Sequence, residues 1–110
     1  MATGRLGTTQ LTTGTIGTYT NVYPVPFGYY SVFNVSFTNT SSSPVTIRLA
    51  LSSSSSTPAI NEFLEYGTTI VANGVFERTG LVAGAGLYVL ASSSGTAVNV
   101  NVYGIETSTS

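Results

Sequence analysis

Short segments in which apolar and polar residues alternate recur along most of the chain, and this pattern restricts its fold more than any other feature. Residues 31–39 place two phenylalanines and a valine on one face and Asn, Ser and Thr on the other. Residues 45–52 and 97–106 alternate in the same way. A side-chain period of two is typical of a half-buried antiparallel strand. No segment longer than a turn shows helical periodicity, so the sequence predicts an all-β protein.

Turn signals separate these segments at regular intervals. The residues Asn73-Gly74, between 68–72 and 75–78, form the strongest short-range signal for a β-hairpin. Residues 61–66 fit either a helical turn or a short strand. The pattern predicts a β-sandwich of about seven to eight antiparallel strands, in jelly-roll or immunoglobulin-like topology, since both arrangements fit this count.

The length of 110 residues indicates a single domain. Residues 1–14 are rich in Gly and Thr without sustained periodicity, and we expect them to form an extended N-terminal arm outside the core. The β-sandwich domain is predicted over residues 15–106. Residues 107–110 form a short C-terminal tail.

The composition argues against catalysis. The chain contains no His, Cys, Asp, Lys or Trp, and charged residues make up 6% of it, against roughly 25% in a typical soluble domain. Most proton-transfer, nucleophilic and metal chemistry needs the missing side chains. Glu62, Glu65 and Glu77 are the one candidate carboxylate cluster, and pairing with arginine is the simpler interpretation of it. We therefore predict no enzyme activity and no catalytic, cofactor-binding or metal-binding residues.

The distribution of charge and apolar residues also limits the partners. The three arginines, Arg5, Arg48 and Arg78, are scattered, so no basic patch for nucleic acid is expected. No run of eighteen apolar residues suggests a membrane-spanning helix, and residues 1–9 lack the apolar stretch of a signal peptide. A net charge of −1 gives little electrostatic protection against self-association, which favours copies that pack together.

Tyrosines and neighbouring polar residues are the candidates for an interaction surface, since exposed Tyr can anchor interfaces or stack on sugars. Residues 87–92 are apolar on both faces, so they form either a strand covered on both sides or one that faces a neighbouring subunit. In the last strand Asn and Tyr point away from the valines. The predicted interface residues are Arg5, Leu6, Tyr29, Tyr30, Tyr88, Leu90, Asn99, Asn101 and Tyr103.

Four stretches of the chain resemble a family of small all-β virion structural proteins of tailed bacteriophages, especially those that infect cyanobacteria. The stretches are Arg5-Leu6-Gly7, Asn34-Val35-Ser36-Phe37-Thr38-Asn39, Glu77-Arg78-Thr79-Gly80-Leu81-Val82 and Val98-Asn99-Val100-Asn101-Val102-Tyr103-Gly104-Ile105-Glu106. The likeness extends from about residue 5 to residue 106. None of these motifs is catalytic.

The resemblance implies a capsid decoration, or cement, protein that binds the outside of the major capsid protein shell and stabilises it. Its expected partners are the major capsid protein and copies of itself, on the exterior of a virion assembled in the host cytoplasm. We expect the arm to clasp a neighbour by strand addition. The alternative is a tail, neck or fibre component, including an adhesin that binds a host glycan.

Overall fold

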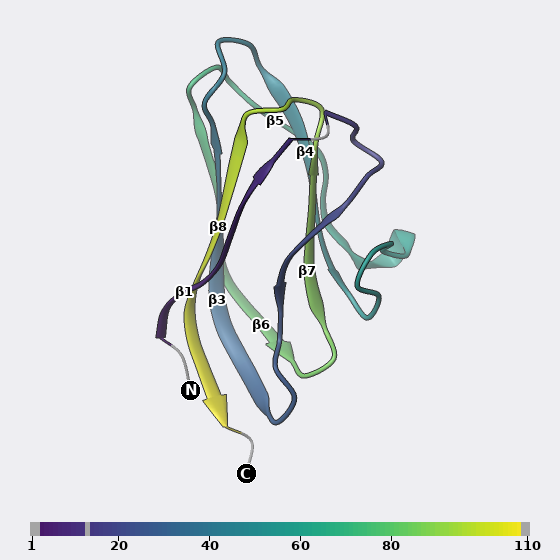
Figure 1. Cartoon of the computed structure of the whole chain (residues 1–110), viewed down its shortest axis with the longest axis vertical. Helices are drawn as coiled ribbons and strands as arrows, with labels where there is room; N and C mark the ends of the chain where they lie inside the picture. The colour runs from purple at the N-terminus through teal and green to yellow at the C-terminus, as the bar shows by residue number, and fades with distance from the viewer. Residues whose placement is uncertain (1–2, 13, 109–110) are drawn as a thin grey trace.

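The computed structural model describes residues 3–12 and 14–108 and contains two β-sheets packed face to face (Figure 1). Its elements are β1 (Thr3–Leu11), β2 (Thr20–Pro24), β3 (Tyr29–Asn39), β4 (Val45–Ser52), the single 3₁₀ turn η1 (Ile60–Glu62), β5 (Phe63–Ile70), β6 (Val75–Gly84), β7 (Tyr88–Ser93) and β8 (Val98–Ser108). All strand pairings are antiparallel. The all-β sandwich predicted from the alternation is confirmed.

The order of the strands selects one of the two topologies that the sequence left open. Sheet A has the order β1-β8-β3-β6, and sheet B has the order β2-β7-β4-β5. The first strand therefore pairs with the last, the second with the seventh, the third with the sixth and the fourth with the fifth. This nesting of two Greek keys is the jelly roll.

The core lies between the sheets and is built from the alternating apolar residues. Phe33, Val35 and Phe37 of β3 and the valines of β8 are buried against the inward residues of sheet B, including Ile47 and Leu49. Because side chains alternate along each strand, the intervening residues face outward. For most residues of β3, β4 and β8, the structure confirms the inward or outward direction assigned from the sequence.

The N-terminal segment differs from the prediction. Thr3–Leu11 is extended, as expected, but it is a strand of sheet A that pairs with β8 over its length. Leu11 is only 2% exposed and belongs to the core. The backbone groups of this segment bond within its own chain, so the expectation of an arm outside the core is wrong for Thr3–Leu11. The mixture of Gly and Thr gave no clear alternation, and Gly is depleted in strands, so the sequence pattern did not indicate this strand.

The expected tail 107–110 is wrong for residues 107–108, because β8 continues to Ser108. Residues 1–2 and 13 of the predicted arm and 109–110 of the predicted tail lie outside the described residues.

The Asn73-Gly74 turn is present, but it does not join two paired strands. Asn73 is the third residue of the turn from Val71 to Gly74 and has a positive φ of 58°. The Gly74 N–H closes the turn by donating to the Val71 carbonyl at 2.9 Å. However, β5 belongs to sheet B and β6 to sheet A. The turn is therefore a corner between the sheets, and the predicted hairpin is wrong.

The buried side chain of Asn39 accounts for this corner. Its Nδ2 lies within hydrogen-bond distance of the carbonyl oxygens of Ser43, Ile70 and Val71, at 2.8, 3.3 and 3.1 Å. The Asn39 N–H donates to the Gly74 carbonyl at 2.9 Å. These bonds tie the end of β3 to the end of β5 and give hydrogen-bond partners to carbonyls at the strand ends and in the adjoining turns.

The connection between β4 and β5 is held by Glu62. Its carboxylate accepts hydrogen bonds from the Ser52 hydroxyl at 2.6 Å and from the N–H groups of Ala59 and Ser53 at 2.8 and 3.1 Å. These bonds, led by that of Ser52, lower the pKa of Glu62. Residues 61–66, for which the sequence allowed a helical turn or a strand, contain the end of η1 and the start of β5.

Candidate interaction surface

The outer face of sheet A is a continuous surface built by residues that alternate with the core. The strand register aligns its residues in rows that cross β1, β8, β3 and β6. One row contains Gln10, Asn99, Thr38 and Val75, and the next contains Thr8, Asn101, Ser36 and Glu77. Most of this face is neutral and polar.

An apolar row crosses the same face nearer the other end of the strands. Val32 is directly opposite Ile105 on β8 and Val82 on β6. Their side chains are 46%, 51% and 62% exposed, and Tyr30 lies two residues from Val32 along β3. We call Ile105, Val32 and Val82 the apolar row. β-Branched side chains this exposed, side by side on three strands, mark a surface suited to contact with a partner.

Two charged residues border the face on opposite edge strands. Arg5 on β1 pairs in register with Tyr103, and Glu77 lies on β6. The Tyr103 hydroxyl donates to the Glu77 carboxylate, and this bond raises the pKa of Tyr103. The face therefore has a positive edge and a negative edge, with neutral residues between them.

The structure groups some of the predicted interface residues and separates others. Arg5, Tyr30, Asn99, Asn101 and Tyr103 all belong to the outer face of sheet A. Whether this surface binds a partner stays a prediction.

The other predicted residues lie elsewhere. Leu6 packs against the core, and Tyr29 is half-buried at the start of β3. Tyr88 is half-buried at the start of β7, in the other sheet. Leu90 is 0% exposed within the single chain, so its assignment to an interface is wrong. Of the two interpretations of residues 87–92, the structure supports the strand covered on both sides.

The apolar row is the part of the surface that the sequence analysis missed. Alternation along β3 and β8 places Val32 and Ile105 outward, so an apolar residue at an outward position was a usable signal. Val82 could not be assigned in this way. A register shift near Gly80, which has a φ of 73° and donates its N–H to Asn34 Oδ1 at 3.0 Å, changes the inward–outward phase of β6.

A second surface feature combines an arginine with aromatic rings on sheet B. The Arg48 guanidinium lies 4.0 Å from the centroid of the Tyr66 ring, and Arg48 Nη1 donates to the Tyr19 hydroxyl at 3.0 Å. This hydrogen bond raises the pKa of Arg48. Phe63 meets Tyr66 edge-on at 4.7 Å. Tyr66 is 56% exposed, so part of its surface is free to contact a ligand or partner.

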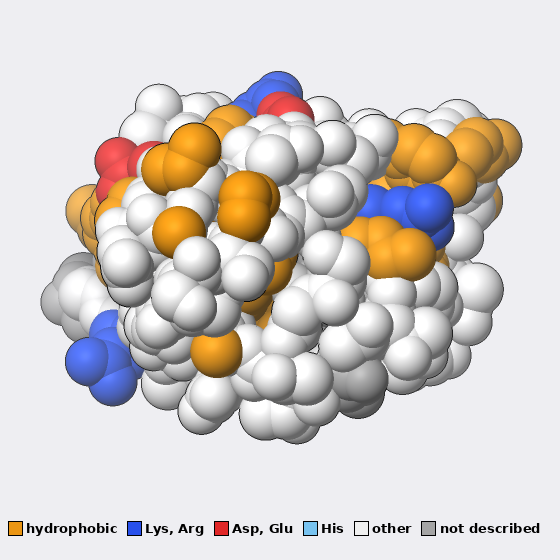
Figure 2. Space-filling model, turned by 90° about the horizontal axis from the view of Figure 1, so that it is seen from above, with side chains coloured by type: hydrophobic (Ala, Val, Ile, Leu, Met, Phe, Trp, Pro, Cys, Tyr) orange, Lys and Arg blue, Asp and Glu red, His pale blue; other side chains and the backbone are white. Residues whose placement is uncertain are grey.

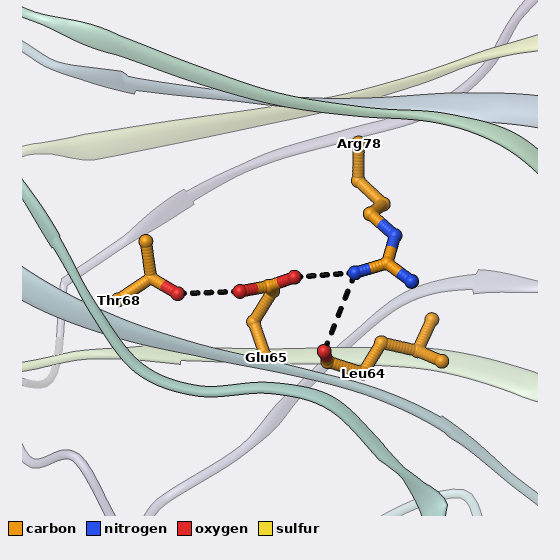
Figure 3. A network of polar contacts seen from close by, with 4 residues as sticks. All are labelled: Leu64, Glu65, Thr68 and Arg78. Atoms are coloured by element: carbon orange, nitrogen blue, oxygen red, sulfur yellow. Dashed lines mark hydrogen bonds and ion pairs between the residues drawn. The ribbon is translucent and has the colours of Figure 1, made fainter.

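The three glutamates considered as a cluster have separate partners. Glu65 forms an ion pair with Arg78 and accepts a hydrogen bond from Thr68 at 2.6 Å, as Figure 3 shows. Arg78 also donates to the Leu64 carbonyl at 3.4 Å, so this network joins β6 of sheet A to β5 of sheet B. Glu62 holds the β4–β5 connection, and Glu77 accepts from Tyr103. In the described part of the chain, no group of three acidic residues is placed to hold a metal ion.

The fourth glutamate is buried inside the sandwich. The Tyr23 hydroxyl donates to Glu106 Oε2 at 2.6 Å and lies 2.6 Å from Ser31 Oγ. Because the phenol has one proton, which goes to Glu106, the Ser31 hydroxyl donates to Tyr23. Burial, reinforced by the bond to Glu106, raises the pKa of Tyr23 to about 12. This network joins β2, β3 and β8, so its role is structural.

Each of the four edge strands departs from regular pairing. The register shifts in β1–β8, β2–β7, β3–β6 and β4–β5, each of which contains one edge strand. The pairings between inner strands, β3–β8 and β4–β7, run in continuous register. Bulges twist an edge and discourage addition of another strand. Contact through a face is therefore favoured over contact through an edge.

The surface of the described residues carries few charges. On the face seen in Figure 2, blue and red groups are few among the white and orange atoms, and one blue group and one red group touch at the upper edge. Among residues 3–12 and 14–108, no pocket is found, and no helix is long and apolar enough to span a membrane. No protein-family model, curated protein or solved structure matches the chain.

Proposed function

We propose that the chain is a structural protein of a bacteriophage virion, a capsid decoration module that binds the outside of the major capsid protein shell and stabilises it. It works by adhesion to neighbouring subunits rather than by catalysis. The observation that carries this proposal is the outer face of sheet A, where an exposed apolar row lies in an otherwise neutral surface.

Two further features support the proposal. The jelly roll is an architecture that viral capsid proteins use, although lectins and other proteins use it as well. A capsid presents many identical sites, so even a small face with few charges can bind there with high occupancy. The resemblance in residues 5–7, 34–39, 77–82 and 98–106 agrees with this role.

The position of the chain in purified virions tests the proposal. Mass spectrometry of the particles should detect the protein, and electron microscopy with a labelled antibody should show label over the whole head. Label at a single pole would contradict the decoration role and support the tail, neck or fibre alternative. Absence from the particle would overturn both.

Glycan binding by an adhesin is a second candidate, and the half-exposed Tyr66 ring favours it. Aromatic faces stack on sugar rings, and the arginine beside Tyr66 could donate to sugar hydroxyls. A glycan array probed with the purified protein tests this role. Binding that is lost in Tyr66→Ala and retained in Tyr103→Ala would support it, whereas absence of binding to host polysaccharides would exclude it.

A further inference from the structure

We propose that the outer face of sheet A pairs with the same face of a second copy of this chain, through a two-fold axis that runs along the strands between the two faces. This inference rests on the proposed function and deepens it: the neighbouring subunit that covers this face is a second copy of the chain, and the dimer attaches to the shell through its remaining surface. The pairing depends on the surface itself and not on the virion, so it can be tested on the purified protein.

The apolar row is self-complementary about this axis. A two-fold axis along the strands places β8 of one copy over β3 of the other. Ile105 then lies over Val32 of the partner subunit, and Val32 lies over the partner's Ile105. Both are about half exposed in the single chain, and their burial removes apolar surface from water on both sides at once.

The two charges at the edges of the face are also complementary about this axis. The same axis puts β1 over β6, so Arg5 at one edge faces the partner's Glu77. Arg5 is level with Asn34 of β3, and Glu77 is level with Ser36, so the two positions differ by about 7 Å along the strands. Extended Arg and Glu side chains together span such a distance. An axis across the strands would instead place β1 over β1, with equal charges on the same edge.

The face is large enough for a stable dimer. Four strands, the longest of eleven residues, cover roughly 700 Å², close to the about 800 Å² that each partner buries in a stable interface. The Asn, Ser and Thr side chains in the remaining rows can both donate and accept hydrogen bonds, so they can pair with copies of themselves. A net charge of −1 leaves little repulsion between copies.

Sedimentation velocity of the purified chain over a range of concentrations tests the dimer. We expect a monomer–dimer equilibrium, and Val32→Arg should raise the dissociation constant by roughly tenfold or more, because it places a charge in the centre of the apolar contact. Val71→Arg is the matched control, since Val71 is 67% exposed but lies at the β5–β6 corner outside the face. A chain that stays monomeric at all concentrations, or equal effects of the two variants, would overturn the proposal.

Charge reversal tests the direction of the axis. Arg5→Glu alone and Glu77→Arg alone should each weaken the dimer, and the double variant should restore it. Failure of the double variant to restore the dimer would overturn the axis along the strands. Because these measurements use no virion, a negative result leaves the proposed function standing, and absence of the protein from virions leaves the dimer standing.

Discussion

Tyr23 shows how one hydroxyl stabilises a buried charge in this fold. Its O–H is the donor to Glu106, which is 8% exposed and lies inside the sandwich. Tyr23→Phe removes this donor and leaves a buried carboxylate less well satisfied, so we expect a loss of about 1–3 kcal/mol in the free energy of unfolding. Urea denaturation measures this loss. Tyr103→Phe, which removes a surface hydroxyl bonded to Glu77, should change stability by less than about 0.5 kcal/mol.

Ionisation of the Tyr23 hydroxyl should lower the stability of the fold at alkaline pH. The pKa of Tyr23 is about 12 in the folded chain, against an ordinary value of 10.0. A raised pKa means that the contribution of this group is complete below pH 10 and is lost as the pH rises towards 12. Unfolding measured by urea at several pH values should show this decline in the wild type, and a smaller one in Tyr23→Phe. Equal declines in the two proteins would contradict the assignment.

Asn39 offers a sharper test of side-chain chemistry, because its amide donates where a carboxylate cannot. Asn39→Asp would place an acceptor against three carbonyl oxygens in a fully buried site, at a cost of about 3 kcal/mol. Asn21→Asp is the control, since Asn21 is exposed on β2 and a carboxylate there stays in water. Thermal melting of both variants should show a large loss for Asn39→Asp and little change for Asn21→Asp.

At the scale of elements, β1 is a strand of the fold and not a detachable arm. Deletion of residues 2–11 should therefore unfold or severely destabilise the chain, because it removes Leu11 from the core and exposes one edge of β8. Circular dichroism and thermal melting measure this effect. A truncated chain with the melting temperature of the wild type would show that the pairing of β1 with β8 contributes nothing.

The β4–β5 connection should loosen in acid. The pKa of Glu62 is lowered, so its hydrogen bonds to Ser53 and Ala59 persist above its ordinary pKa and are lost as the pH falls through the lowered value. Hydrogen exchange, expressed as protection relative to the free peptide, should show this loss at those two amides. Glu62→Ala should remove their protection at neutral pH. Full protection in that variant would contradict the role of Glu62.

Much of the fold followed from local pattern. The outward and inward faces of β3, β4 and β8 are set by an alternation that sequence shows directly. The contacts that were missed depend on distant pairing: Glu106 meets Tyr23 across 83 residues, and Asn39 binds the end of β5 next to the Asn73-Gly74 corner. Turn chemistry specifies the local geometry, but it does not specify which sheet receives the next strand.

Only part of the candidate surface could be predicted, because the rest of it also depends on pairing between distant strands. Alternation identified Asn99, Asn101 and Tyr103 as outward residues, and the structure aligns them with neighbours on β1 and β3. The alternation could not show that Leu90 is covered within its own chain, because residues distant in the sequence cover this side chain. It also could not show the apolar row, whose three members come from three different strands.

At the scale of the whole molecule, the chain combines edge strands with register shifts and a mostly neutral face that carries an exposed apolar row. Edges of this kind limit uncontrolled strand addition, while the face allows contact with a partner of matching shape. The architecture therefore fits a module that is repeated many times on a larger surface.

The most direct test of this account is the thermal stability of phage capsids that lack the protein, measured by scanning calorimetry before and after the purified chain is added. We predict that the chain binds these capsids and raises the temperature at which the shell comes apart. Val71→Arg, altered outside the face, should do the same. Capsids that fail to bind the folded wild-type chain, or that bind it and come apart at an unchanged temperature, would contradict the account.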